Sequence, residues 1–488
     1  MPDIRRTLIG GQGLAALETR LKEDLQLLCY PGKSWVPPRQ GVTDVTIIGG
    51  GMCGMVAWFA LQTAGIVNTR VLDRSPRGFE GPWLNYARME TLRSPKELTG
   101  PAFGHGALTF QAWYRAGFGD QQWEQLGLIP RPVWMDYLRW YRDVLGIPIE
   151  NETSLDKVER EGDVLRLHFS GETSGSFLSR KLVFATGRDG TGEPNIPGFV
   201  DGLDRRYWAH SADDIDFDSL KGKRVAVIGV GASAVDNAAE ALEHGAAEVR
   251  HFIRRKQMPT INKLTGAGSI GFNHGFATLS DELRWRIMQY VFASQTPPPN
   301  GSVRRVSQHR NAFFHFDKGI AGLSETGGAV ELKFSDGRRH VADFVILGTG
   351  FRTNPLSRTE LGDASGNIRL WKDVYQPPAD EHSEDLALFP YLNSDFSFSE
   401  KIPGKSPWIN NIYCFNYGAT ASLGKISGDI PGISEGAAWL ARATAAKIFS
   451  EDADQHLQAI KAYDKPELDG SEWVSTQMPD IQGKEHIA

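Results

Sequence analysis

Two glycine motifs, each directly after a strand-like apolar run, constrain the fold of this chain more than any other feature. The first follows residues 45–48 and the second follows residues 224–228, and both continue into stretches compatible with a helix. A strand that ends in closely spaced glycines and continues as a helix is the start of a βαβ unit. We therefore predict an α/β protein with two Rossmann-like dinucleotide-binding domains.

The first motif reads G-x-G-x-x-G at Gly49, Gly51 and Gly54. We expect Gly49 to make the turn, Gly51 to let the backbone approach a pyrophosphate, and Gly54 to let the helix pack closely. The next strand-like run ends in Asp73, near the ~20-residue spacing at which a carboxylate accepts from a ribose hydroxyl. A purely structural glycine turn with a solvent-facing Asp73 is the alternative interpretation.

The second motif, of the form G-x-G-x-x-A, contains Gly229, Gly231, Ser233 and Ala234. The strand-like run 249–253 that follows it ends in Arg254 and Arg255 rather than in an acid. A carboxylate there would repel a 2′-phosphate, whereas a guanidinium binds one bidentately. The contrast with Asp73 assigns NADPH to the second motif and FAD, which lacks that phosphate, to the first. A solvated basic strand end is the alternative.

The length of 488 residues exceeds the size at which one hydrophobic core stops growing, about 250–300 residues. Strand-like residues 344–347 end at a glycine-rich turn, much as residues 182–185 end at Thr186 and Gly187, and we interpret both turns as crossings between domains. The NADPH-binding domain is then inserted into the FAD-binding domain. The predicted parts are an N-terminal helical arm and linker (1–40), the first FAD-binding part (41–200), the NADPH-binding domain (201–342) and the completing FAD-binding part with the C-terminal tail (343–488).

Composition excludes several classes of function. A net charge of -6 supplies no basic field for a nucleic acid. No run of ~18 apolar residues occurs and the first residues do not resemble a signal peptide, so we expect no membrane partner and a cytoplasmic location. Cys29, Cys53 and Cys414 form no Cys-x-x-Cys pair, which excludes a dithiol-relay reductase, and each is expected to be buried. A homo-oligomer is left open.

Three further segments have clear local signals. Leucines at helical spacing predict a helix over residues 14–28, and an alanine-rich stretch predicts another over residues 434–448. The run Pro297–Gly301 predicts a surface loop that acts as a connector.

With these motifs in place, residues 43–450 resemble the class B flavoprotein monooxygenases, which include flavin-containing monooxygenases, Baeyer-Villiger monooxygenases and amine N-hydroxylases. The resemblance also rests on residues 81–83, on the Ala-Thr-Gly at residues 185–187 and on the Leu-Gly-Thr-Gly-Phe at residues 347–351. It implies cofactor contacts for Trp83, Thr186, Gly187 and Gly350. The family signature F-x-G-x-x-x-H is only partly met, because His210 lies further from Gly202 than the pattern requires. For His210 a role as the family's linker histidine and one as an ordinary packing residue both stay open.

The segment 89–98 is similar to the stretch before the flavin ring in flavin-containing monooxygenases and to the M-Q-x-x-x-x-K-D-L stretch of ornithine and lysine N-hydroxylases. Residues 132–140 likewise resemble a helix of those hydroxylases, so the subtype stays open. The resemblance suggests that Arg93 and Lys96 share a cavity beside the flavin ring and help bind an anionic substrate or the peroxide. Arg93 can hold a peroxide anion or a substrate carboxylate there. A structural ion pair is the alternative for Arg93.

Gly428 and Asp429 precede the predicted C-terminal helix. In similar two-dinucleotide flavoproteins a helix start at this place donates amides to the pyrimidine edge of the flavin, which stabilises the reduced ring. A packing helix without flavin contact is the alternative, and the two are compatible.

The resemblance implies that NADPH reduces FAD and that dioxygen then forms a C4a-peroxyflavin, which oxygenates an amine, a sulfur or a ketone of a small molecule. Because the cofactor carries this chemistry, the absence of a Ser-His-Asp, Cys-His or metal-ligand pattern is expected. Two rivals remain. One is an NADPH-dependent reductase that passes electrons to a quinone or a protein, and the other is a nucleotide-sensing flavoprotein without turnover.

Overall fold

The computed structural model describes residues 11–172, 174–188 and 190–478. The chain forms two compact units that divide after Ala445. Both glycine motifs lie in the first unit. The second contains the end of α13 (Ile433–Glu451), all of α14 (Ala453–Ala462), and exposed residues without helix or strand up to residue 478.

A seven-stranded sheet contains the first glycine motif. Its order is β3-β2-β1-β6-β5-β4, and β17 also pairs with β6. Parallel pairing joins β3, β2, β1, β6 and β17, whereas β4, β5 and β6 pair antiparallel. The strands are β1 (Val42–Ile48), β2 (Thr69–Leu72), β3 (Ile149–Glu150), β4 (Thr153–Glu161), β5 (Val164–Gly171), β6 (Gly175–Phe184) and β17 (Ile412–Cys414). Because β17 belongs to the C-terminal third, the chain returns to this sheet late.

The second glycine motif lies in a five-stranded sheet of order β11-β10-β9-β15-β8, in which every pairing is parallel. The strands are β8 (Trp208–His210), β9 (Arg224–Ile228), β10 (Glu248–Phe252), β11 (Ala312–His315) and β15 (Phe344–Leu347). Since β15 pairs with β8 and β9, this sheet extends beyond residue 342, where the sequence placed the end of the second domain. The two-domain division itself stays a prediction.

Side-chain alternation along β9 explains how both faces of this sheet are covered. Val225 and Val227 pack in a core with α6 (Ala232–Glu243), whereas Ala226 and Ile228 pack in another with the antiparallel sheet β12-β13-β14. That small sheet comprises β12 (Ile320–Thr326), β13 (Ala329–Phe334) and β14 (Arg339–Ala342). Burial on both faces accounts for the continuous apolar run that the sequence shows at this strand.

Two short strands, β7 (Gly192–Pro194) and β16 (Phe351–Thr353), pair antiparallel where the chain leaves one large sheet and where it returns. They join the two crossings that the sequence predicted. Together with the parallel pairings of both large sheets, this arrangement confirms the α/β class.

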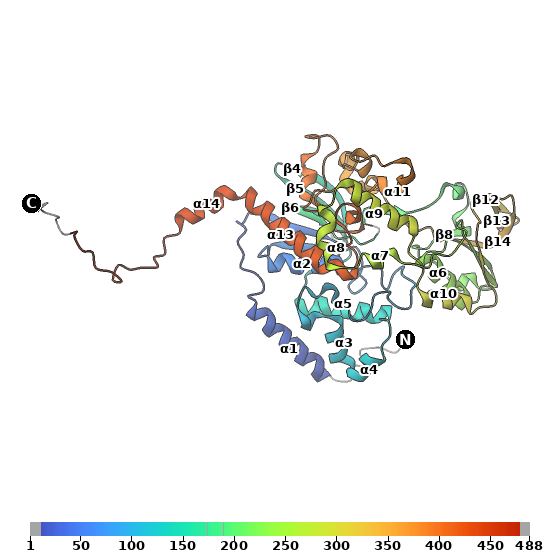
Figure 1. Ribbon diagram of the computed structural model, residues 1–488, viewed down its shortest axis with the longest axis horizontal. Helices are drawn as coiled ribbons and strands as arrows, with labels where there is room; N and C mark the ends of the chain where they lie inside the picture. Colours follow the sequence, from blue (N-terminus) through green and yellow to red (C-terminus); the bar gives the residue numbers. More distant parts are fainter. Residues whose placement is uncertain (1–10, 173, 189, 479–488) are drawn as a thin grey trace, which may run out of the picture. The chain divides into compact units, whose positions relative to one another are not determined.

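The remaining helices cover the sheets or connect them. Figure 1 shows α1, α3, α4 and α5 grouped together, and α6 beside α10. Trp140 on α5 donates to Glu18 on α1 at 2.9 Å, so the N-terminal helix is held by a side-chain contact. These helices are α1 (Gly11–Leu27), α2 (Met52–Thr63), α3 (Phe110–Phe118), α4 (Asp120–Gln125), α5 (Arg131–Leu145), α7 (Lys263–Gly266), α8 (Ile270–Gly275), α9 (Asp281–Ser294), α10 (Asn300–Ser307), α11 (Glu384–Ala387) and α12 (Thr420–Leu423).

Both predicted terminal helices are confirmed, as α1 and α13. The loop expected at Pro297–Gly301 is partly wrong, because Pro298 is buried and Asn300 and Gly301 begin α10. Pro299 precedes the first helical turn, where a proline is compatible with the unpaired amides of a helix start.

Among the cysteines, Cys53 and Cys414 are buried as expected, and burial raises the pKa of each thiol to about 12. The expectation of burial is wrong for Cys29, which is exposed just after α1 ends. No helix in the described part of the chain has the length and apolar character needed to cross a membrane.

One buried histidine supports the second glycine motif from the neighbouring strand. His251 on β10 lies with Nδ1 3.1 Å from the carbonyl oxygen of Gly229, and its ring stacks on Phe314 at 4.7 Å. Its Nε2 has no hydrogen-bond partner among the described residues, so protonation would leave a buried N–H unpaired. Burial lowers the pKa of His251 to about 4.

Replacing His251 by Asn tests this support. Because the pKa of His251 is lower in the folded than in the unfolded chain, its neutral form stabilises the protein above pH ~6.5, and that stability is lost as the pH falls toward ~4. The full loss corresponds to about 3 kcal/mol. Asn can still donate to Gly229 but does not titrate. Urea unfolding at about pH 7.5 and about pH 5 should therefore show a smaller acid loss in His251→Asn, and equal losses would contradict the assignment.

Candidate dinucleotide sites

The first glycine motif forms a cradle at the start of α2. Gly49 has φ +102°, and a Cβ there would lie 2.6 Å from the carbonyl oxygen of Ala185. A Cβ at Gly54 would lie 1.7 Å from the carbonyl oxygen of Gly49. Both positions therefore require glycine.

Gly51 differs from these two positions. It caps the N-terminus of α2, and a Cβ there would meet nothing closer than 3.6 Å, at Gly81. The packing of the protein leaves room in front of this helix end, where a pyrophosphate would accept from backbone amides. The cradle fits the diphosphate of FAD.

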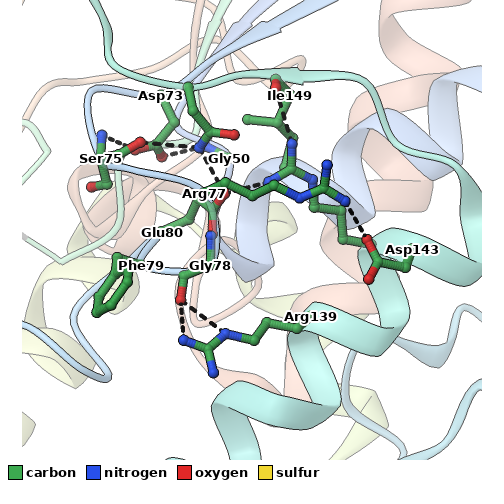
Figure 2. A network of polar contacts seen from close by, with 12 residues as sticks. Gly50, Asp73, Ser75, Arg77, Gly78, Phe79, Glu80, Arg139, Asp143 and Ile149 are labelled. Atoms are coloured by element: carbon green, nitrogen blue, oxygen red, sulfur yellow. Dashed lines mark hydrogen bonds and ion pairs between the residues drawn. The ribbon is translucent and has the colours of Figure 1, made fainter.

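Asp73 closes the cradle from the end of β2 (Figure 2). Its two carboxylate oxygens accept from the backbone amides of Gly50 and Ser75, each at 2.7 Å. A carboxylate has about four lone-pair sites, so Asp73 can still accept from a ribose hydroxyl. The interpretation of Asp73 as a solvent-facing acid does not fit its burial, whereas the ribose contact stays a prediction.

A buried ion pair that sequence reasoning missed supports the loop after Asp73. Glu80 accepts from Arg142 on α5 at 2.6 Å and from Asn151 at 2.7 Å, and it also accepts from the amide of Gly78. Figure 2 shows this network, with Arg139 donating twice to the carbonyl of Gly78. These contacts determine the path toward Gly81 and Trp83. Among the many charged residues nearby, no spacing in the sequence singles out Glu80.

Trp83 follows that loop and is half-buried. Its ring lies 6.1 Å from Trp134 in an edge-to-face arrangement, and its carbonyl oxygen accepts from Arg131. Both partners belong to α5, the helix whose residues 132–140 resemble a helix of the N-hydroxylases. Cofactor contact by Trp83 stays a prediction.

The second glycine motif forms a similar cradle at the start of α6. Gly229 has φ +114°, and a Cβ there would lie 2.5 Å from the carbonyl oxygen of Gly348. A Cβ on Gly348 would in turn lie 2.3 Å from that of Ala234, so the helix passes close to the end of β15. Gly231 caps α6 with nothing within 4 Å of a Cβ, and Ser233 is exposed beside it. This open helix end also fits a pyrophosphate.

The basic strand end lies just beyond β10. Arg254 is exposed, whereas Arg255 is half-buried and donates to the carbonyl oxygen of Ala293 at 2.8 Å. Of the two, Arg254 is therefore the better placed to bind a 2′-phosphate, and Arg255 already has a protein partner.

His210 lies at the end of β8 and is fully buried. Its Nδ1 accepts from the amide of Ala212 at 3.1 Å, so the ring proton belongs on Nε2, which donates to the carbonyl oxygen of Gly350 at 2.9 Å. Burial lowers the pKa of His210, which keeps the ring neutral. His210 thus ties the second sheet to the returning crossing, where Gly350 has φ +75°. Its catalytic role stays a prediction.

Arg93 and Lys96 have different partners. Lys96 donates to the carbonyl oxygens of Trp123 and Leu126 at 2.5 and 2.7 Å, where a cation stabilises the end of α4. Arg93 is exposed and donates to the carbonyl oxygen of Pro297 at 2.8 Å. The contacts do not join the two side chains, and their common cavity stays a prediction.

The crossing at Thr186 and Gly187 meets the C-terminal third. Thr186 accepts from Asn416 at 3.3 Å, and the carbonyl oxygen of Gly187 accepts from the amide of Tyr417 at 3.2 Å. A Cβ on Gly428 would lie 3.6 Å from that same amide. Three predicted cofactor residues from distant parts of the sequence therefore lie side by side. The buried Asn416 that joins them has no motif around it.

Asp429 lies close to the first cradle. Burial, and secondly the charge of Asp429, raise the pKa of Cys53 at the start of α2. Asp429 itself lies 3.4 Å from Lys425 as an ion pair. Flavin contact by Gly428 and Asp429 stays a prediction.

Comparison with known sequences gives two findings. The sequence pattern of a family described as pyridine nucleotide-disulphide oxidoreductase matches residues 46–265. The chain is also 37% identical over 464 residues to the FAD-dependent urate hydroxylase of Xanthomonas campestris pv. campestris. The alignment covers 94% of this chain and 98% of the relative.

Solved structures show the same fold. The reduced form of an ornithine hydroxylase from Pseudomonas aeruginosa has a TM-score of 0.62 at 16% identity, covering 85% of this chain and 100% of that one. An ornithine N-hydroxylase from Kutzneria sp. 744, with reduced FAD, NADP⁺ and L-ornithine, has a TM-score of 0.63 at 14% identity, covering 83% and 99%.

Valine at Gly51 and at Gly231 should separate the two sites. A Cβ at Gly51 would come no closer than 3.6 Å to protein atoms and one at Gly231 would meet nothing within 4 Å, whereas a branched side chain at either position would fill the space that a pyrophosphate needs. We expect Gly51→Val to lose FAD, measured by flavin absorbance, and Gly231→Val to keep FAD but lose NADPH binding. Circular dichroism provides the control for folding. Normal flavin content in Gly51→Val would overturn the assignment of the first cradle.

Proposed function

Since this chain belongs to the flavoprotein monooxygenase family that includes the FAD-dependent urate hydroxylase of Xanthomonas campestris, we propose that it uses NADPH and dioxygen to hydroxylate urate or a closely related anionic oxopurine. It is an FAD-dependent oxidoreductase of the class B monooxygenases. The proposed reaction consumes substrate, NADPH, a proton and dioxygen, and it releases hydroxylated substrate, NADP⁺ and water.

The observation that carries this proposal is the end-to-end similarity to the urate hydroxylase. At 37% identity over 94% of the chain, the similarity includes both cradles and the segment 83–98 between them. A urate-type substrate differs from the amine, sulfur and ketone centres that the sequence resemblance suggested. The ornithine hydroxylases, at 14% and 16% identity, support the fold alone.

The contacts of Lys96 disfavour an amino-acid substrate. Lys96 aligns with the lysine of the M-Q-x-x-x-x-K-D-L stretch of the N-hydroxylases, a resemblance that predicts a position beside the flavin ring. Instead, Lys96 donates to two carbonyl oxygens at the end of α4. Arg93 remains exposed and permanently charged, and a guanidinium can donate two parallel hydrogen bonds to a planar anion. We therefore propose Arg93 for substrate binding.

The protein would contribute binding and orientation. The amides at Gly51 would hold the FAD diphosphate, the amides at Gly231 would hold that of NADPH, and Arg254 would bind its 2′-phosphate. Bound FAD would take a hydride from NADPH and supply the C4a-peroxyflavin that delivers one oxygen atom. Closing water out of the space between the cradles would prevent wasteful loss of that oxygen.

Product analysis with labelled dioxygen tests the substrate. We expect urate to accelerate NADPH oxidation and one ¹⁸O atom to appear in the product for each NADPH consumed. L-ornithine and L-lysine should have little effect. Coupled hydroxylation of either amine instead of urate would overturn the proposed substrate class. Fast reduction of a quinone without oxygen incorporation would favour a reductase.

Replacing Arg254 and Arg255 together by Ala tests the proposed use of NADPH. A charge-assisted contact contributes roughly 1.5–3 kcal/mol, so the ratio of kcat/KM for NADPH over NADH should fall at least tenfold while the NADH value is kept. Because Arg255 already binds Ala293, Arg254→Ala alone should account for most of the fall. Equal use of both nucleotides by the unmodified enzyme would show that this assignment is wrong.

A further inference from the structure

The first and the second dinucleotide unit are the parts of the chain built around the first and the second cradle, and both lie in the compact unit that ends at Ala445. The segment Trp83–Arg93 contacts both dinucleotide units. On the side of the first dinucleotide unit, the side chain of Arg131 at the start of α5 donates to the carbonyl oxygens of Trp83 and Met89. The backbone amide of Arg131 donates to the carbonyl oxygen of Glu90 at 2.9 Å. The amide of Leu92 also donates to Ile129, at 2.8 Å. The segment is therefore bound along its length to the unit that contains the first cradle.

Arg305 binds the same segment from the second dinucleotide unit. This residue of α10 is 8% exposed, and its Nη1 donates to the carbonyl oxygen of Arg88 at 3.1 Å. Its Nε and Nη2 bind Glu243 at 2.9 and 2.7 Å, and Nη2 also binds Glu240 at 3.1 Å. One guanidinium thus joins α10, α6 and the segment.

Two further hydrogen bonds cross the same boundary. Arg93 donates to the carbonyl oxygen of Pro297, just before α10, and Arg88 reaches the carbonyl oxygen of Asp213, just after β8, at 3.4 Å. Both arginines are more accessible than Arg305, which also forms an ion pair across this boundary with Glu90 at 3.8 Å. Arg305 is the buried centre of the junction.

The contacts of Arg305 connect the helix of the second cradle with the segment that begins beside the first cradle. Glu240 and Glu243 belong to α6, the helix that begins at Gly231. At the other end, Gly81, two residues before Trp83, faces Gly51 of the first cradle. Hydride transfer needs reacting atoms about 3–3.5 Å apart, so it depends on the register between the two cradles.

We propose that Arg305 is a positioning residue that holds the second dinucleotide unit in register against the first. The inference rests on the proposed use of NADPH. A planar guanidinium donates in several directions at once, so Arg305 can bind two carboxylates of α6 and still reach the carbonyl of Arg88. A lysine would keep the charge opposite the carboxylates but has only one nitrogen with which to do both.

Arg305→Lys tests the positioning role without leaving the carboxylates unpaired, and Arg304→Lys is the matched control. Arg304 is the neighbouring residue on α10, is exposed, and binds only Asn300 of its own helix in the described contacts. In anaerobic stopped-flow mixing, we expect Arg305→Lys to lower the limiting rate of flavin reduction by NADPH at least tenfold. FAD content and the Kd for NADPH should change less than twofold, and Arg304→Lys should behave as wild type.

A second measurement does not depend on NADPH. In hydrogen exchange of the FAD-bound enzyme, the amides of residues 83–93 should exchange at least fivefold faster in Arg305→Lys than in Arg304→Lys. A purely local role in α10 would speed exchange in α6 and α10 only, and would overturn the proposal. So would a wild-type reduction rate in Arg305→Lys.

The two measurements also separate this inference from the proposed function. If NADPH does not reduce the wild-type flavin but residues 83–93 exchange faster as expected, the proposed use of NADPH fails and the junction stands. If NADPH reduces the wild-type flavin and neither the rate nor the exchange responds to Arg305→Lys, the positioning role fails while the proposed function stands.

Discussion

The close approach of a helix to a strand end is the constraint on which both nucleotide sites depend. At the first cradle the carbonyl of Gly49 occupies the place that a Cβ of residue 54 would take, and at the second cradle the end of β15 touches Ala234 of α6. Glycine or alanine at these positions allows each helix to point its N-terminal amides at open space in front of Gly51 and Gly231. The open helix ends therefore follow from backbone packing, and in the proposed function charged side chains only select which nucleotide binds there.

The path of the chain between the two sheets connects the two cradles. The chain leaves the first sheet after β6, builds the second sheet, and returns through β16 and β17. This return brings Asn416 against Thr186, where the amide of Asn416 donates to the hydroxyl of Thr186. The proposed flavin site thus draws on residues from the beginning, the middle and the end of the first compact unit, and the proposed role of Arg305 is to keep the two cradles facing one another.

Local sequence patterns predicted much of this correctly because each rests on contacts between near neighbours. The α/β class, the strand and helix around each motif, and helices α1 and α13 all follow from periodicity and glycine spacing. The errors at Cys29 and at Asn300 and Gly301 arose where exposure or helix extent depends on the neighbouring elements. Lys96 shows the same limit, since its resemblance to a substrate-binding lysine gives no information on the carbonyls of α4 that bind it.

The sequence by itself determined that this chain builds two dinucleotide cradles, because turn glycines act over a few residues. The charges at the strand ends predict which cradle takes the extra phosphate. Only the tertiary structure decided that Glu80 and Arg142 support the first cradle, that Asn416 and His210 tie the crossings together, and that Arg305 joins the two units. Those contacts link residues far apart in the chain, and many other arginines and glutamates have the same local surroundings. What selects these particular pairs is burial in the folded protein, where an unpaired charge is costly and only matched geometry offsets that cost.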